Sequence, residues 1–176
     1  YSVVRKFVGK VQAKQNANIG FEQAGKVAIL YVDEGDVVKK GAILAQQDVE
    51  LLTIERDEMQ ARMTQTRADL ILVKANLKRI RALKKRSFSS QQNLEELEAR
   101  QQGLLSTKQR IDAGLHSLTV KIEKSTLLAP FDAVVSKRFI SSGEVIAAGT
   151  SALNILQIGQ DEVKVGVPTA LLSQLQ

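Results

Sequence analysis

The chain has 176 residues, a formal net charge of +6, 4% aromatic residues, no Trp and no Cys. The lack of cysteine excludes a disulfide framework, a thiolate metal site and a cysteine nucleophile. The few aromatic residues predict an aliphatic core, which suits coiled coils and small sandwiches better than a large enzyme fold, and no stretch approaches the ~20 apolar residues of a membrane span.

The first 48 residues have the composition of strands and turns. Apolar residues predict a strand over residues 3–11, a short strand near Ile19 and Phe21, and a β-rich run over residues 25–32. Gly35, among three acidic residues, and Gly41 mark two turns, because Gly tolerates positive φ and carboxylates bond to nearby backbone.

Residues 49–125 contain no Pro, and apolar residues recur in them every three or four positions. This spacing predicts two helices, over residues 49–86 and 90–124, that form an antiparallel coiled-coil hairpin with its tip at residues 87–90. The predicted seam of the first helix comprises Leu52, Arg56, Met59, Met63, Thr66, Leu70, Val73, Leu77, Ile80 and Lys84. That of the second helix comprises Leu94, Leu97, Gln101, Leu104, Lys108, Ile111, Leu115, Leu118 and Ile122.

An offset of 108 positions aligns residues 25–41 with residues 133–149. Val27, Val32, Val37 and Val38 fall on apolar residues, and Gly35 and Gly41 fall on Gly143 and Gly149. We interpret this match as an internal repeat of two β half-motifs that pair in one domain. The predicted hairpin lies between them, and Pro130 opens the return because Pro cannot continue a helix.

The two ends of the chain fit neither half-motif. Residues 162–167 alternate like a strand, and residues 168–176 have the pattern of a short helix. Together with residues 1–15 they look like parts of a further domain that the chain does not complete.

Two stretches, residues 32–45 and residues 128–135 with two glycines downstream, resemble the two lipoyl-type half-motifs of periplasmic adaptor proteins, also called membrane fusion proteins. Ala133 stands where this family more often has Gly. The resemblance implies an α+β fold: a lipoyl-like β-sandwich formed from two half-motifs, split by an antiparallel α-helical coiled-coil hairpin, with partial β-barrel segments at both termini. The implied domains are the partial β-barrel (1–15 and 160–176), the lipoyl-like domain (16–48 and 126–159) and the hairpin (49–125).

The resemblance also implies a function. Periplasmic adaptors link an inner-membrane transporter to an outer-membrane channel for efflux or secretion in Gram-negative bacteria. They are not enzymes, they assemble as homo-oligomeric rings or funnels, and their hairpin tips dock on the channel. We therefore expect a periplasmic protein that is anchored to the inner membrane in its full-length form.

The family's tip motif is an Arg, a Leu four residues later and a Ser seven residues after that. Arg79, Leu83 and Ser90 match this spacing, and the resemblance implies that they contact the channel. Arg79 and Leu83 lie outside the predicted seam, on one helix face. The plainer interpretation is a solvated Arg, a Leu near the seam and a Ser that caps the second helix.

Other functions have less support. Residues 74–86 hold seven basic residues and no acid, yet no groove-reading motif accompanies them, so we expect no nucleic-acid partner. The hairpin occupies the turn where a lipoyl or biotinyl carrier would hold its lysine, so we expect no cofactor. His116 lacks partners for a metal site, and no catalytic motif is present. A biotinyl or lipoyl carrier domain and a structural coiled-coil dimerisation module remain the alternatives.

Overall fold

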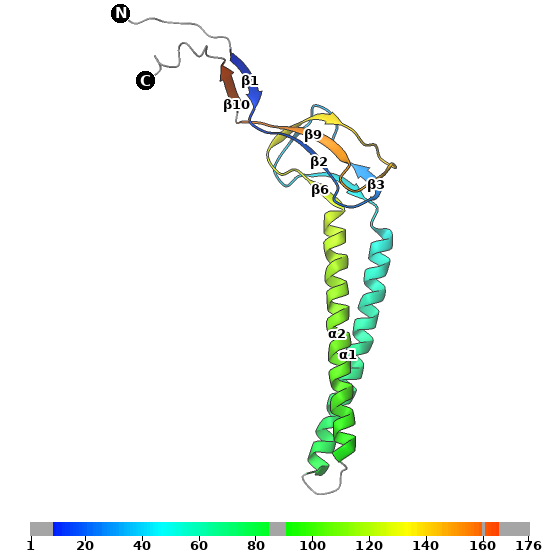
Figure 1. Cartoon of the computed structure of the whole chain (residues 1–176). Coiled ribbons are helices and arrows are strands. Elements are labelled where there is room, and N and C mark those ends of the chain that lie inside the picture. The colour runs from blue at the N-terminus through cyan, green and yellow to red at the C-terminus, as the bar shows by residue number, and fades with distance from the viewer. Residues whose placement is uncertain (1–8, 85–90, 160, 166–176) are drawn as a thin grey trace, which may run out of the picture. The chain divides into compact units, whose positions relative to one another are not determined.

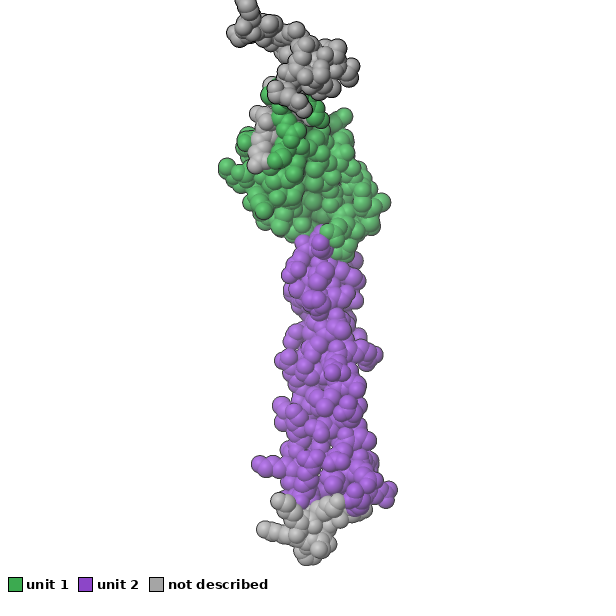
Figure 2. Space-filling view, turned by 60° about the vertical axis from the view of Figure 1, so that its left-hand side comes forward, with its two compact units in different colours: residues 1–48, 125–176 green, residues 49–124 purple. Residues whose placement is uncertain are grey.

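A computed structural model describes residues 9–84, 91–159 and 161–165. The chain divides into two compact units, residues 1–48 with 125–176 and residues 49–124 (Figure 2), which we call the β unit and the hairpin. The fold is therefore α+β, as predicted. Neither described helix has a stretch apolar and long enough to span a membrane.

The described part of the β unit contains antiparallel sheets. One four-stranded sheet has the order β2-β9-β7-β4 and the other the order β6-β5-β3-β8. Their strands are β2 (Asn16–Gly20), β3 (Gly25–Leu30), β4 (Val37–Val38), β5 (Ile43–Gln47), β6 (Thr126–Leu128), β7 (Ala133–Arg138), β8 (Val145–Ile146) and β9 (Ser151–Gln157). A separate two-stranded sheet joins β1 (Gly9–Ala13) to β10 (Asp161–Val165).

The two half-motifs match element by element at the offset of 108 residues. β3 corresponds to β7 and β4 to β8 over their full lengths, and β5 corresponds to the first five residues of β9. The matched turn glycines share positive φ, 92° at Gly35 and 86° at Gly143. Such φ values explain why both turns carry Gly. The predicted internal repeat is confirmed.

Each half-motif completes the sheet of the other. β4 pairs with β7, and β8 pairs with β3. The N–H of Gly35 donates to the carbonyl of Val135 (2.8 Å), and the equivalent N–H of Gly143 donates to the carbonyl of Val27 (2.8 Å). Because these strand pairings and backbone hydrogen bonds recur with the halves exchanged, the β unit has an approximate two-fold symmetry and neither half has a complete sheet alone.

The core of the β unit lies between the two halves. Val27 and Val135, equivalent residues, are both buried. At three other pairs of equivalent positions a large buried side chain in one half corresponds to a buried alanine in the other, so large and small side chains complement each other in a close-packed core. These pairs are Phe21 with Ala129, Leu44 with Ala152, and Ala45 with Leu153.

The hairpin consists of α1 (Glu50–Lys84) and α2 (Gln91–Lys124), which run side by side in opposite directions (Figure 1). Every described side chain of the two predicted seams is buried or partly buried. Val73, Leu77 and Leu94 form a buried cluster against which Ile80, Leu97 and Leu104 pack. The predicted coiled-coil seam is confirmed, and α2 is continuous through Gly103 and Gly114.

The chain returns to the β unit where it left. The N–H of Gln47, at the end of β5, donates to the carbonyl of Ser125 (2.8 Å), which follows α2. β6 then pairs with β5. The helix predicted over residues 168–176 lies outside the described residues.

Candidate functional site

The hairpin tip is the predicted docking site, and Arg79 is its one member with a described side chain. Arg79 lies on α1, is exposed, and donates from Nη2 to Oδ1 of Asn76 one turn earlier. It contributes nothing to the seam, which runs through Leu77 and Ile80. Arg79 is therefore available to an external acceptor.

Leu83 and Ser90, the other two predicted tip residues, lie at the ends of the two helices. Leu83 is in the last turn of α1, four residues after Arg79, but its side chain lies outside the described atoms. Ser90 also lies outside the described residues, directly before α2 begins at Gln91. The helix boundaries thus leave the three residues close in sequence at the tip, with their contacts undescribed.

Charge is divided between the two helices near the tip. Lys74, Lys78, Arg79 and Arg81 are exposed on α1, while Glu95, Glu96 and Glu98 are exposed on α2. Arg81 and Glu98 form an ion pair across the hairpin (2.8 Å). The basic run therefore has acidic neighbours within the hairpin itself, which weakens the case for a nucleic-acid partner.

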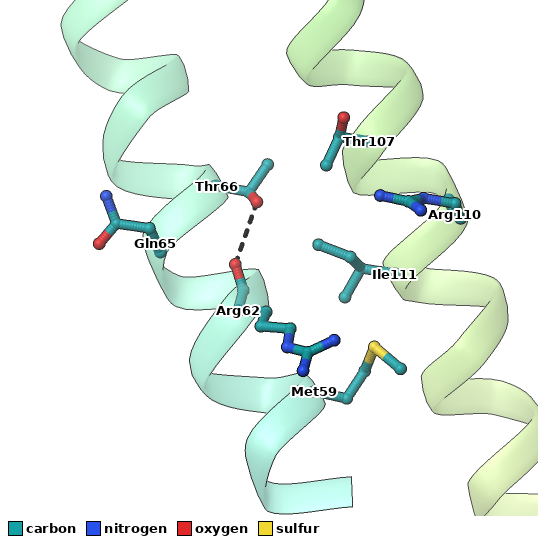
Figure 3. A pocket seen from close by; sticks show the side chains of 7 residues that line it. All are labelled: Met59, Arg62, Gln65, Thr66, Thr107, Arg110 and Ile111. Atoms are coloured by element: carbon teal, nitrogen blue, oxygen red, sulfur yellow. Dashed lines mark hydrogen bonds between the residues drawn. The ribbon is translucent and has the colours of Figure 1, made fainter. Parts of the chain in front are cut away.

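A groove of about 380 Å³ interrupts the seam farther from the tip (Figure 3). Met59 and Ile111 provide apolar walls, and Arg62 and Arg110 extend from the two helices beside it. The buried Thr66 donates its hydroxyl to the carbonyl of Arg62 (3.0 Å). The groove thus lies at the level where the seam carries a polar residue.

Lys39 and Lys40 follow β4 in the turn that contains Gly41. The carboxylate of Asp132 accepts a hydrogen bond from the backbone N–H of Lys40 (2.8 Å) and pairs with Lys39 Nζ (3.4 Å). The hydrogen bond from the Lys40 backbone is the main cause that lowers the pKa of Asp132.

Among the residues that the structure describes, no three His, Cys, Asp or Glu residues are grouped as a metal site would require.

The predicted sites did not include an apolar surface on α1. Ile71 is 70% exposed and Leu72 is 55% exposed. Their signal in the sequence was their position outside the 3–4 spacing of the seam, next to alanines that recur every seven residues. These alanines are Ala61, Ala68, Ala75 and Ala82.

Known proteins of similar sequence include proteins named for multidrug resistance and for macrolide export. The chain is 26% identical over 163 residues to multidrug resistance protein MdtA of Xenorhabdus bovienii, a match that covers 92% of this chain and 40% of the relative. It is 25% identical over 164 residues to macrolide export protein MacA of Yersinia pestis, covering 85% of this chain and 44% of the relative. The chain thus spans less than half the length of these curated relatives. No protein-family model matches it.

The fold is also shared with solved structures. The membrane fusion protein Spr0693 of Streptococcus pneumoniae R6 aligns with 96% of this chain and 70% of its own, with a TM-score of 0.75 and 16% identity. The similarity to Spr0693 is one of fold, whereas the similarity to MdtA and MacA is one of sequence. Together they agree with the resemblance carried by the two half-motifs: the chain is similar in sequence to multidrug resistance and macrolide export proteins, and similar in fold to a membrane fusion protein.

Proposed function

We propose that this chain is the hairpin-bearing part of a periplasmic adaptor that links an inner-membrane transporter to an outer-membrane channel. The observation that supports this most is the combination of two interlocked half-motifs with a coiled-coil hairpin inserted after Gln47. Its relatives are named for multidrug resistance and macrolide export. The proposed work is mechanical and non-enzymatic, in a homo-oligomeric ring or funnel.

The finer assignments belong to the same proposal. The β unit would be a lipoyl-like domain (16–48 and 126–159) that packs in the ring. The sheet of β1 and β10 would belong to a β-barrel domain (1–15 and 160–176), and residues 49–125 would form the docking hairpin. The full-length protein would be periplasmic and anchored to the inner membrane.

The tip is proposed to contact the channel through Arg79, Leu83 and Ser90. An exposed guanidinium next to the end of a helix can donate several hydrogen bonds to carbonyls or carboxylates of a partner. Leu83 would bury its side chain in the contact, and Ser90 would cap α2 and so hold the direction of the tip.

We predict that Arg79→Asp or Leu83→Asp, introduced into the complete gene, abolishes transport while the protein remains folded. Transport is measured as substrate resistance or secretion in cells that lack the native gene. Arg67→Asp, at another exposed Arg of α1, and Leu51→Asp, at a Leu that is 81% exposed at the start of α1, are the matched controls. Normal transport by a stably expressed tip variant would refute the docking role.

The two alternative functions, a biotinyl or lipoyl carrier domain and a structural dimerisation module, predict different experimental results. A carrier domain would show added mass on a lysine in an intact-mass spectrum of the natively expressed protein. A plain dimerisation module would show no crosslink between its tip and a channel. We expect the unmodified mass, and a crosslink from a photoreactive residue at the tip to an outer-membrane channel.

A further inference from the structure

The groove beside Thr66 combines two kinds of lining side chain. Met59 and the buried Ile111 are apolar, whereas Arg62 of α1 and Arg110 of α2 are exposed cations (Figure 3). Its volume of about 380 Å³ falls in the range of small-molecule sites, roughly 300–1,000 Å³. The lining therefore suits a small ligand that has an apolar body and a negatively charged end.

The two arginines of the groove are not fully neutralised within the hairpin. Arg62 has one acidic partner, Glu58, one turn earlier on the same helix and 4.0 Å away. Among the described residues Arg110 has no ion pair. Near the tip, by contrast, Arg81 of α1 meets Glu98 of α2 at 2.8 Å. Two guanidinium charges against one carboxylate leave the groove with one net positive charge, which a monoanion would neutralise.

We propose that this groove binds the anion of a medium-chain fatty acid. The alkyl chain packs against Met59 and Ile111, and the carboxylate lies between Arg62 and Arg110. A guanidinium group matches a carboxylate with two parallel hydrogen bonds, and the flexible Met side chain adapts to an alkyl chain. The ligand contacts both helices at the level where the seam carries Thr66. This site lies within one hairpin, so it does not depend on the proposed adaptor role.

A second groove, of about 340 Å³, lies between the helices nearer the tip and is the competing site. Its apolar lining residues are Leu70, Ile71 and Leu105, and its basic ones are Arg67, Lys74 and Lys108. The cation that α2 contributes to it, Lys108, is already paired with Asp112. Only the first groove thus has an arginine from each helix, which is why we place the carboxylate there.

The two methionines of the chain provide the direct test. Met59 lines the groove, whereas Met63 is 0% exposed in the seam. The whole chain, labelled with ¹³C at the Met methyl groups, is titrated with sodium decanoate below the concentration at which decanoate forms micelles. A Met63→Leu variant assigns the two signals. We expect a saturable shift of the Met59 signal that is much larger than that of Met63. No saturable shift, or equal shifts, would overturn the proposal.

The role of charge is tested with a cationic ligand and a matched pair of variants. Decylammonium should bind at least about tenfold more weakly than decanoate, and Arg110→Gln should weaken decanoate binding about tenfold. Arg100→Gln is the matched control, because Arg100 is exposed on the same helix and lines neither groove. Equal binding of the two ligands, or equal effects of the two variants, would overturn the anion site. If Arg67→Gln weakens binding and Arg110→Gln does not, the anion lies in the second groove and our assignment is wrong.

Filling the groove separates ligand binding from hairpin stability. Thr66 is 6% exposed and lines the groove, so Thr66→Leu places a larger apolar side chain in it. We expect a higher melting temperature of the hairpin by circular dichroism, together with decanoate binding that is weaker by about tenfold or more. Undiminished binding by this folded variant would overturn the proposed location. Should Thr66→Leu fail to fold, Arg110→Gln decides, because the position of Arg110 is exposed.

Discussion

Asp132 is the residue whose ionisation matters most clearly to the β unit. Its carboxylate accepts the N–H of Lys40, in the other half-motif, and lies beside the Lys39 ammonium. The backbone hydrogen bond, followed by the Lys39 hydrogen bond and the charges of both lysines, lowers the pKa of Asp132 against the opposing effect of desolvation. The exposed ion pair with Lys39 by itself contributes little, because solvent screens it.

This lowered pKa gives a pH-dependent prediction. The stabilisation by ionised Asp132 is fully present above the unfolded-state pKa of Asp, about 4, and is lost as pH falls through the lower folded pKa. Asp132→Asn should therefore slightly lower the melting temperature of the β unit at pH 7, and the difference should be smaller at pH 2. Thermal unfolding of both proteins at the two pH values measures this. An equal difference at both values would contradict a role for the charge.

The two glycines of α2 differ in what surrounds them. Gly103 is exposed and has open space where a Cβ would lie, whereas a Cβ on Gly114 would lie 3.1 Å from Met59 Cε and 3.5 Å from Sδ. Gly within a helix costs up to about 1 kcal/mol relative to Ala. Gly103 therefore lowers the stability of the helix without allowing closer packing inside the hairpin. Gly114, by contrast, lets the Met59 side chain approach the facing helix.

We predict that Gly103→Ala raises the free energy of unfolding of the hairpin by about 0.5–1 kcal/mol. Gly114→Ala should gain less, since the end of the Met59 side chain must shift. Urea unfolding followed by circular dichroism at 222 nm measures both changes. A larger increase in the free energy of unfolding for Gly114→Ala than for Gly103→Ala would contradict the open surroundings of Gly103.

The helices of the hairpin and the stripe of residues buried between them were predicted from the sequence, whereas the groove between the helices was not. The 3–4 spacing predicted the seam because a helix with such spacing buries one stripe, and burial in the structure follows it even at Thr66 and Arg56. The groove beside Thr66 was not predicted, since the gap depends on how side chains of both helices fill one level. Contacts of Leu83 and Ser90 stay predictions.

The β strands were predicted less completely. The offset of 108 residues found the matching strands and turns, because equivalent positions need similar residues. The pairings of β4 with β7 and of β8 with β3 were not predicted, because β4 and β8 have two residues each and so short a strand shows no periodic pattern from which its partner strand could be inferred. β6 was missed for a similar reason: its three residues follow α2 directly and find their partner only in the folded unit.

At the scale of the whole molecule, the β unit depends on both half-motifs but makes its closing contacts without the hairpin. Gln47 and Ser125 are joined by a backbone hydrogen bond of 2.8 Å, so the two ends of the insertion are already adjacent. Among the described residues, those that form the buried core of the β unit all come from outside the insertion. A hairpin added at this point can therefore vary without disturbing the sheets that hold it.

We predict that replacing residues 49–124 with a short Gly-containing turn leaves the β unit folded. A closed loop of a few residues costs less conformational entropy than the natural insertion, and all the crossed contacts between halves remain. A dispersed proton–nitrogen correlation spectrum and a cooperative thermal transition would confirm the fold. The matched control is residues 9–48 alone, which should be unfolded because Val27 and Gly35 then lack Glu144 and Val135, their partners in the other half. An unfolded shortened chain, or a folded single half, would show that the interlocked halves are not what holds the β unit together.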